Sequence, residues 1–283
     1  MLRILVIGIT GMLGNTLLRH LSENNKFSVL GSSRRDKLKA HQKINYIHLK
    51  NLDAENEDEF FQTLKTYKPD VVINCIGVIK QLNHADDPLR VLPINSIFPH
   101  KLHHLCNKEA IRLIHVSTDC VFTGKKGNYL ETDISDALDL YGKSKYIGEL
   151  HGKNSLTLRT SIIGHEIDSK ESLLEWFLSQ EGSVHGYRDA IFSGLTTLEL
   201  SNVIEKTILF HKDLSGLYHV SSKPISKYDL LNLIKKVYKK KIKIIPSDQV
   251  KINRSLNSEK FQKATNIEVS DWESMIKSMK NFN

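Results

Sequence analysis

The sequence predicts an α/β fold, in which a doubly wound parallel sheet is followed by a smaller C-terminal α/β portion. The first observation behind this prediction is an aliphatic run over residues 2–7 that passes directly into closely spaced glycines and a helical pattern. The second is that further apolar runs alternate with helical patterns, which implies parallel strands joined by right-handed crossovers. The third is that the predicted elements become shorter past Gly164. We therefore expect a Rossmann-type domain over 1–164 and a cap over 165–283, some segments of which return to the main sheet.

The first predicted element is a buried strand over Leu2–Ile7, and the run Gly8-Ile9-Thr10-Gly11-Met12-Leu13-Gly14 follows it directly. The leucines after this run keep helical spacing, so the order is strand, glycine turn, helix. Glycines let the backbone turn sharply and approach a pyrophosphate, which sits against the positive end of the helix. The run therefore predicts a dinucleotide site, with contacts from Gly8, Thr10, Gly11, Met12, Leu13 and Gly14.

The second predicted strand, over 27–31, indicates which dinucleotide is bound. An acidic residue after this strand would bond the ribose hydroxyl of NAD. The chain instead has Ser33, Arg34 and Arg35 near this place, and guanidinium groups favour a ribose that carries a 2′-phosphate. We therefore predict NADP(H) as the cofactor; the alternative is that both arginines are ordinary loop residues.

Strands and helices continue to alternate after this point, and three of the predicted elements place residues near the cofactor. Asp53 is placed to hydrogen-bond the adenine amine or, alternatively, to cap a helix. The fourth strand ends at Cys75, Ile76 and Gly77, where backbone can pass close to the cofactor. Asn95 supports active-site water or backbone, or is an ordinary cap. The predicted strands are at 46–49, 70–75, 111–116, 156–159, 190–192, 217–220 and 242–245, and the helices at 58–67, 94–107, 173–178, 198–210 and 227–238.

A hydroxyl, a phenol and an ammonium are predicted to meet at the carboxyl end of the fifth strand, where ligands bind in an open parallel sheet. That strand delivers Ser117, Thr118 and Asp119, and Tyr141 and Lys145 follow four residues apart. On a helix these two side chains share one face. A nearby ammonium lowers the pKa of a phenol by at most about three units, which makes it a proton donor near neutrality. Without this context, the spacing is more often that of a solvated helix face.

The chain carries three motifs in order on one α/β pattern: Gly8-x-x-Gly11-x-x-Gly14, Ser117-Thr118-Asp119 and Tyr141-x-x-x-Lys145. It resembles the extended short-chain dehydrogenase/reductases, and its Ser-Thr-Asp-x-Val-Phe run and Leu158-Arg159-Thr160-Ser161 are similar to the dTDP-4-dehydrorhamnose reductase branch. The resemblance implies that Thr118 holds the substrate carbonyl and Tyr141 donates the proton. It also implies that Lys145 binds the nicotinamide ribose and lowers the pKa of the tyrosine.

The activity that this resemblance implies is NADPH-dependent reduction of the 4-keto group of a UDP- or dTDP-linked 4-keto-6-deoxy sugar, in deoxysugar biosynthesis for surface glycans. The cap would bind the nucleotide diphosphate sugar. Part of the excess of basic residues between 223 and 263 would then face a pyrophosphate. The residues expected to contact the substrate are Lys80, Asp119, Glu175, Trp176 and Arg188.

The residue after Asp119 leaves other chemistries open. The related 4,6-dehydratases place Asp-Glu after the threonine, whereas Asp119 is followed by Cys120, which disfavours dehydration. A cysteine at this position is similar to that of the epimerase-reductases that include GDP-fucose synthase, where it acts as acid and base. A bifunctional epimerase/4-reductase that uses Cys120 is therefore an alternative, with Glu175, His165 and Lys80 as candidates for its second acid/base group. A non-catalytic NADP-binding regulatory subunit is a second alternative.

Composition limits the remaining partners and the compartment. Three widely spaced cysteines favour a reducing compartment, and hence a cytoplasmic protein, without disulfides or a metal site. The net charge of +8 includes a cluster of lysines between 235 and 243, and no aromatic residue except Tyr238 alternates with them, so nucleic acid is not expected. No apolar run is long enough to span a bilayer. The partners expected are the nucleotide sugar and, for a homodimer, a second copy of the chain.

Overall fold

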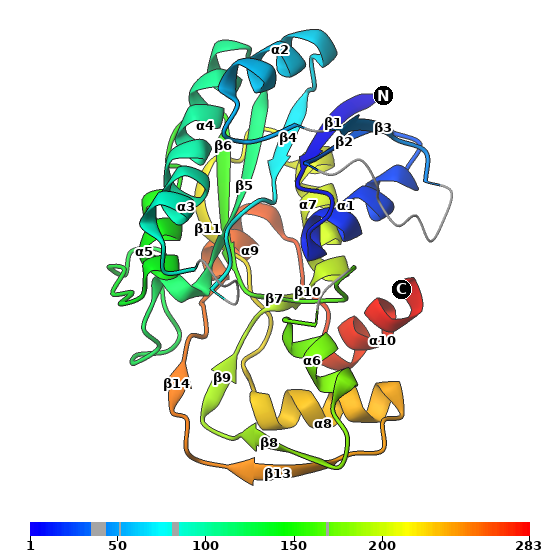
Figure 1. Ribbon diagram of the computed structural model, residues 1–283, viewed down its shortest axis with the longest axis vertical. Coiled ribbons are helices and arrows are strands. Elements are labelled where there is room, and N and C mark those ends of the chain that lie inside the picture. Colours follow the sequence, from blue (N-terminus) through cyan, green and yellow to red (C-terminus); the bar gives the residue numbers. More distant parts are fainter. Residues whose placement is uncertain (35–43, 51, 81–84, 168–169) are drawn as a thin grey trace.

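The computed structural model describes residues 1–34, 44–50, 52–80, 85–167 and 170–283. Within these ranges the largest sheet has seven strands, all parallel, in the order β11-β6-β5-β4-β1-β2-β3. They are β1 (Leu2–Ile7), β2 (Phe27–Ser33), β3 (Ile47–Lys50), β4 (Val71–Asn74), β5 (Arg112–Thr118), β6 (Ser155–Thr160) and β11 (Gly216–His219). Helices cover both faces, so the predicted doubly wound α/β fold is confirmed (Figure 1).

The alternation of side chains along β1 explains why both faces are covered. Because neighbouring residues of a strand point to opposite faces, Ile4 and Val6 enter one hydrophobic core and Leu5 and Ile7 enter another. Both faces of the strand are therefore buried in hydrophobic cores, which is typical of a parallel sheet. The first core is covered by α1 (Met12–Ser22) and α7 (Thr197–Phe210), and the second by α2 (Glu57–Tyr67) and α4 (Phe98–Lys108).

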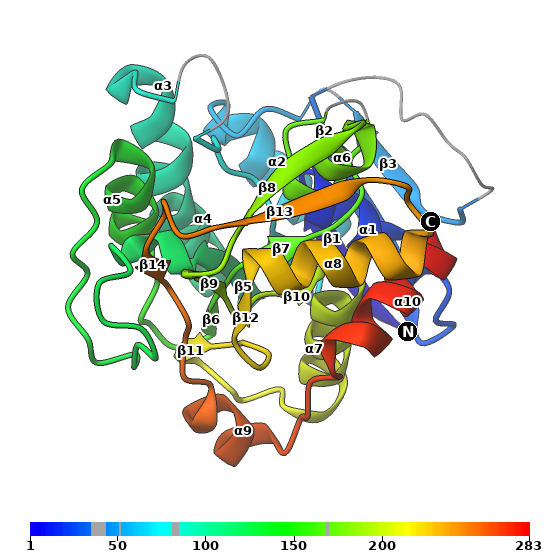
Figure 2. The ribbon, with the colours of Figure 1, turned by 90° about the horizontal axis from the view of Figure 1, so that it is seen from below.

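Most of the chain after residue 164 forms the lower part of Figure 1. Its strands are β8 (Ser183–Tyr187), β9 (Ala190–Phe192), β10 (Leu195–Thr196), β12 (Ile225–Ser226), β13 (Lys243–Ser247) and β14 (Ile252–Asn253). Its helices are α6 (Leu173–Ser179), α8 (Lys227–Tyr238) and α10 (Trp272–Phe282), whereas α9 (Glu259–Thr265) packs against β11 of the main sheet. β8 and β13 run in parallel and α8 packs against both (Figure 2). β11 and α7 instead belong to the main sheet and its helical layer.

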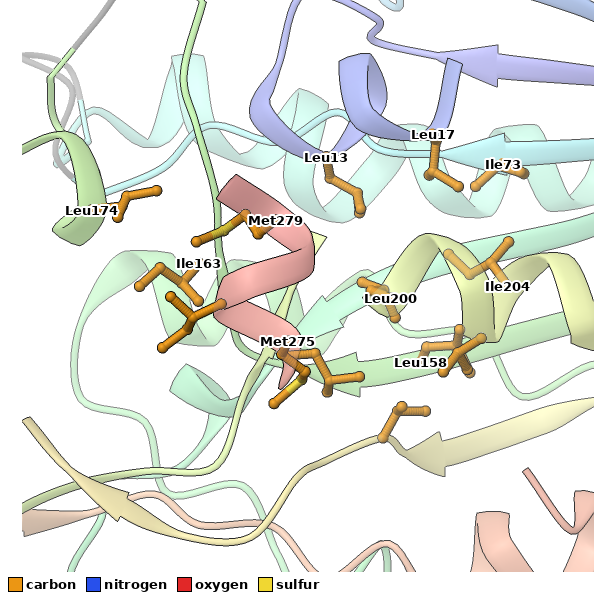
Figure 3. Close-up of a cluster of buried hydrophobic side chains, with 14 of the residues drawn as sticks. Leu13, Leu17, Ile73, Leu158, Ile163, Leu174, Leu200, Ile204, Met275 and Met279 are labelled. Atoms are coloured by element: carbon orange, nitrogen blue, oxygen red, sulfur yellow. The ribbon is translucent and has the colours of Figure 1, made fainter. Parts of the chain in front are cut away.

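One hydrophobic core joins these lower elements to the sheet. Figure 3 shows this core, in which α10, at the C-terminus, packs beside α7 and α1. Because the core is continuous, α10 connects the lower elements to α1, the helix that follows the glycines. The labelled members are Leu13, Leu17, Ile73, Leu158, Ile163, Leu174, Leu200, Ile204, Met275 and Met279.

The helix predicted over 94–107 begins earlier, at Pro88, and its α-helical winding is interrupted by a π-helical turn. It consists of α3 (Pro88–Leu92), a π-helical turn over Pro93–Ile97, and α4. Asp87 starts α3, because its side chain caps the first turn, and Pro93 has no N–H to continue the α-helical bonding. The other predicted elements are present within a few residues of their predicted bounds. The short strands β7 (Ile162–Ile163), β8, β10, β12 and β14 were not predicted.

Three further observations concern the cysteines, metal binding and membranes. Cys75, Cys106 and Cys120 are free thiols. In the part of the chain that the structure describes, no three His, Cys, Asp or Glu side chains are grouped so that they could hold a metal ion. None of the helices found in the described ranges is both long and apolar enough to cross a membrane.

Candidate active site

The glycine turn between β1 and α1 has the shape of an anion site. Gly8 has φ +89°, and its carbonyl oxygen accepts a 3.0 Å hydrogen bond from the Gly11 N–H. A Cβ on Gly14 would lie 2.2 Å from this oxygen, so only glycine fits there. Gly11 is the N-cap of α1, no side chain caps the helix and its first turn has no acidic residue. The backbone N–H groups in the first turn of α1, which begins at Met12, are therefore open to a pyrophosphate.

The end of β2 lies against this turn, where the ribose of a dinucleotide would be. The Gly8 and Ile9 N–H groups both donate to the Ser32 carbonyl oxygen at 3.1 Å. Ser33 follows with its hydroxyl 2.8 Å from His48 Nε2, and Arg34 is exposed. The second arginine of the prediction, Arg35, lies outside the described residues.

Asp53 is not a helix cap. Its Oδ1 atom accepts a 3.1 Å hydrogen bond from the Glu55 N–H, while the N-cap of α2 is Asn56. The capping alternative is therefore wrong, and the adenine contact of Asp53 stays a prediction.

Asn95 holds the segment after β4 against α5 (Leu140–Ile147). It is fully buried in the π-helical turn, and its side-chain amide exchanges two hydrogen bonds with the Val78 backbone, of 2.8 Å and 2.9 Å. It also donates to Ser144 Oγ at 3.1 Å. The capping alternative for Asn95 is therefore wrong as well. A Cβ on Gly77 would lie 3.3 Å from Asn95 Oδ1 and 3.9 Å from Lys145 Nζ, so the glycine keeps open the space beside the lysine.

Tyr141 and Lys145 lie on α5, as predicted, and packing fixes this helix against the end of β5. A Cβ on Gly142 would lie 2.2 Å from the Cys120 carbonyl oxygen, so the helix approaches the 3₁₀ turn at Asp119–Val121 closely. Lys145 is 5% exposed, and its ammonium donates a 2.8 Å hydrogen bond to the Val116 carbonyl oxygen. Burial lowers the pKa of Lys145 to about 8, against the opposing effect of Glu149.

The expected lowering of the tyrosine pKa by Lys145 is wrong for this structure. Burial raises the pKa of Tyr141 above its ordinary value, Cys120 acts in the same direction, and a hydrogen bond with the Thr118 side chain opposes them. The physical reason is that desolvation disfavours the charged phenolate, while the Lys145 ammonium is bonded to the Val116 carbonyl oxygen. Tyr141 is therefore a neutral phenol at neutral pH, which is the form that can give up a proton.

Thr118, Asp119 and Cys120 gather around this phenol. Thr118 Oγ1 accepts a 3.1 Å hydrogen bond from the Cys120 N–H and lies 3.3 Å from Asp119 Oδ1. Burial raises the pKa of Asp119, while Arg254 and Lys227 oppose that rise. Burial and the neighbouring Asp119 raise the pKa of the Cys120 thiol to about 11. Cys120 is therefore protonated at neutral pH.

Two basic residues at this site, Lys227 and Arg254, were not predicted. Arg254 Nη1 lies 3.6 Å from Cys120 Sγ, and Lys80 Nζ lies 3.8 Å from the same sulfur. Lys227 lies over the Phe192 ring, 4.0 Å from its centroid. Both residues come from the basic stretch between 223 and 263, but the sequence contains no signal that separates them from its exposed lysines.

The other predicted substrate residues form separate groups. Glu175 pairs with His165 Nδ1 at 2.5 Å, and His165 Nε2 lies 2.8 Å from the Tyr238 hydroxyl. Trp176, next to Glu175 on α6, is 37% exposed. Arg188 pairs with Asp248 through bonds of 2.9 Å and 3.1 Å on the surface. Their contact with a substrate stays a prediction.

A buried ion pair behind β5, also not predicted, supports the site. The Glu149 carboxylate accepts hydrogen bonds from Arg159 Nε at 2.7 Å and Nη2 at 2.6 Å, and from Ser117 Oγ at 2.6 Å. His219 Nε2 lies 3.3 Å from Arg159 Nη1. Since Glu149 follows α5 and Ser117 precedes Thr118, this network joins the helix and the strand that carry the candidate catalytic groups.

The chain is similar to known proteins in its sequence and in its fold. The family model for the RmlD substrate binding domain matches residues 2–282. The chain is 29% identical over 311 residues to dTDP-4-dehydrorhamnose reductase of Aggregatibacter actinomycetemcomitans, covering 100% of this chain and 99% of that one. It is 27% identical over 252 residues to Methionine adenosyltransferase 2 subunit beta of Danio rerio, covering 81% and 71% of the two chains. The solved structure of dTDP-4-dehydrorhamnose reductase from Bacillus anthracis in complex with NADP has the same fold, with a TM-score of 0.82, 21% identity and 99% coverage of each chain.

Proposed function

Because the chain belongs to the RmlD substrate binding domain family, we propose that it is a reductase of the 4-keto group of a nucleotide-linked 4-keto-6-deoxy sugar. NADPH is the proposed hydride donor, and the sugar carries UDP or dTDP. The observation that carries this proposal is the Thr118 hydroxyl, the neutral Tyr141 phenol and the Lys145 ammonium at the end of β5 and on α5. In this proposal residues 1–164 hold the cofactor, residues 165–283 mainly hold the sugar nucleotide, and the protein works in the cytoplasm on precursors of surface glycans.

The proposed chemistry divides between the cofactor and the protein. NADPH, when bound, supplies a hydride to the carbonyl carbon. Thr118 orients the carbonyl oxygen, and Tyr141 gives that oxygen its proton, so that the ketone becomes an alcohol. A pKa raised by burial keeps Tyr141 protonated before the reaction, which suits a proton donor. Lys145, charged below a pKa of about 8, holds the nicotinamide ribose in this proposal.

The glycine turn, Ser33 and Arg34 support NADP(H) as the cofactor. The open N-terminus of α1 suits the pyrophosphate, and the exposed Arg34 guanidinium suits a 2′-phosphate. Asp53, the turn at Cys75, Ile76 and Gly77, and Asn95 complete the proposed cofactor site. Comparison of kcat/KM for NADPH and NADH tests this assignment, and a clear preference for NADH would contradict it.

The activity itself is tested by NADPH oxidation with a panel of UDP- and dTDP-linked 4-keto-6-deoxy sugars, with and without N-acetyl groups. We expect loss of NADPH absorbance with at least one member and no loss with the corresponding 4-hydroxy sugars. If no member is reduced although the protein binds NADPH, the chain is not a reductase. The similarity to Methionine adenosyltransferase 2 subunit beta would then favour the alternative of a regulatory NADP-binding subunit.

The epimerase alternative depends on the Cys120 thiol. Lys80 and Arg254 flank the sulfur, but burial and Asp119 raise the thiol pKa to about 11, so little thiolate is present to remove a proton from carbon. Reduction without epimerisation is therefore the function that this geometry favours. Incubation of the keto sugar with the protein in deuterated water without NADPH tests this, because epimerisation introduces deuterium beside the ketone and simple reduction does not.

A further inference from the structure

His115 is a buried histidine on β5 that the proposed reaction does not use. Its side chain is fully buried, and it lies beside Asn74 of β4, its partner in the parallel pairing of the two strands. The Nδ1 atom of His115 lies 3.2 Å from Asn74 Nδ2. The Nε2 atom is also buried, and it has no hydrogen-bond partner within the ranges that the structure describes. An apolar side chain would avoid the cost of this unpaired nitrogen, so packing alone does not explain the histidine.

The hydrogen bonds of Asn74 determine where the His115 proton lies. The Ile76 N–H, which can only donate, lies 3.3 Å from Asn74 Oδ1. The other end of the same amide is therefore an NH₂ group, and it donates to His115 Nδ1. A neutral imidazole that accepts at Nδ1 carries its proton on Nε2. Burial lowers the pKa of His115 well below its usual range, and Lys145 on α5 and His100 on α4 act in the same direction, so the ring is neutral.

Asn74 connects His115 to the turn that follows β4. Ile76, which donates to Asn74, lies against the glycine turn, because a Cβ on Gly8 would lie 2.4 Å from Ile76 Cγ2. On the other side, a Cβ on Gly77 would lie 3.9 Å from Lys145 Nζ. The turn after β4 therefore lies between the candidate pyrophosphate site and the candidate ribose-binding lysine, and the hydrogen bond from Ile76 to Asn74 fixes its backbone.

We propose that His115 is a positioning residue for the cofactor, because its Nδ1 atom holds the Asn74 amide in the orientation that fixes the Ile76 backbone for NADPH. This inference rests on the proposed function, since it adds His115 and Asn74 to the cofactor site named there. His115 acts through Asn74 and touches no reacting atom. The competing explanation is a purely structural role, in which only the packing of the ring matters.

The first test is the Kd for NADPH, measured by calorimetry, in two variants that differ at the position of Nδ1. His115→Leu removes the acceptor of the Asn74 amide. His115→Asn keeps an acceptor there, because the asparagine oxygen is as far from the backbone as Nδ1 is. His104→Leu, at an exposed position of α4, is the control for the loss of one imidazole. We expect His115→Leu to weaken NADPH binding by about fivefold to tenfold, and the other two variants to change it by less than about twofold.

The comparison of the two His115 variants separates positioning from packing. Both variants lose the packed ring, so a structural role would weaken NADPH binding in both alike, and that result would overturn the inference. We also expect His115→Leu to raise KM for NADPH while kcat at saturating NADPH stays within about twofold of the wild type, because a backbone that is fixed before binding contributes equally to the ground state and the transition state. An equal fall in kcat would contradict this.

The wild-type protein offers a test that does not depend on the folding of a variant. Nitrogen NMR distinguishes the two neutral forms of an imidazole, and we expect the His115 proton on Nε2; a proton on Nδ1 would overturn the inference. If the wild-type protein reduces a keto sugar but His115→Leu binds NADPH as tightly, the inference is wrong and the proposed function stands. If NADPH binding falls in His115→Leu and is kept in His115→Asn, but the wild-type protein reduces no keto sugar, the proposed function is wrong and the inference stands. If the wild-type protein binds no NADPH, both are wrong.

Discussion

The Lys145 ammonium donates a 2.8 Å hydrogen bond to the carbonyl oxygen of Val116, two residues before Thr118. This hydrogen bond joins the Lys145 side chain, on α5, to the backbone of β5. It therefore helps to fix the distance between the helix that carries Tyr141 and the strand that carries Thr118. It also explains why Lys145 is charged in a buried position, where Glu149 supplies the opposing charge.

Activity should fall as pH rises through about 8. Burial lowers the pKa of Lys145 to about 8, so the ammonium is present below that pH and is lost above it. The charged and titratable groups that face it are Glu149 after the same helix, Cys75 after β4 and His115 on β5. We expect kcat/KM for NADPH to be flat below about pH 7.5 and to fall about tenfold per unit above about pH 8.5. A profile that stays flat to pH 10 would show that the charge of Lys145 is not needed.

The two glycines around the start of α1 should respond differently to alanine. A Cβ on Gly14 would lie 2.2 Å from the Gly8 carbonyl oxygen, whereas a Cβ on Gly11 would meet that oxygen at 3.4 Å, an ordinary contact. We expect Gly14→Ala to lower the free energy of unfolding by about 1–3 kcal/mol, and Gly11→Ala to change it little. Gly11→Ala should still weaken NADPH binding, because the methyl group occupies the path of the pyrophosphate. Urea unfolding and NADPH titration measure the two effects; equal stability losses would contradict this account of the turn.

The buried pair of Glu149 and Arg159 should matter far more than the surface pair of Arg188 and Asp248. Glu149→Ala leaves the Arg159 charge buried without a partner, and we expect a loss of about 3–5 kcal/mol in the free energy of unfolding. Arg188→Ala breaks a pair whose side chains are 54% and 58% exposed, and we expect a loss below about 1 kcal/mol. Denaturant unfolding of both variants makes the comparison. Similar losses would mean that the network behind β5 does not support the site.

The parts of the site that were predicted from the sequence are those encoded by neighbouring residues. The glycine turn follows a strand directly, and Tyr141 and Lys145 occur within one helix, so local spacing was enough to predict their placement. The direction of the Tyr141 pKa was wrong, because burial by packed elements, rather than spacing to Lys145, determines it.

The parts that were missed depend on contacts between distant segments. Arg254 reaches Cys120 across 134 positions of sequence, and a basic stretch gives no sign of which of its members turns inward. Lys227 is likewise distinguished from the other lysines of α8 only by its place at the start of the helix, over Phe192. The π-helical turn that carries Asn95 was missed for a related reason, since its winding follows from Pro93 and from packing rather than from apolar spacing.

The most direct test of the central claim is the turnover of Tyr141→Phe with a 4-keto-6-deoxy sugar nucleotide that the wild-type protein reduces. The substitution removes only the phenolic hydroxyl, so the helix and the cofactor site remain. We expect kcat to fall by at least about 100-fold while the Kd for NADPH changes by less than about threefold. A variant that oxidises NADPH at a near-normal rate would show that Tyr141 is not the proton donor and would contradict the proposed mechanism.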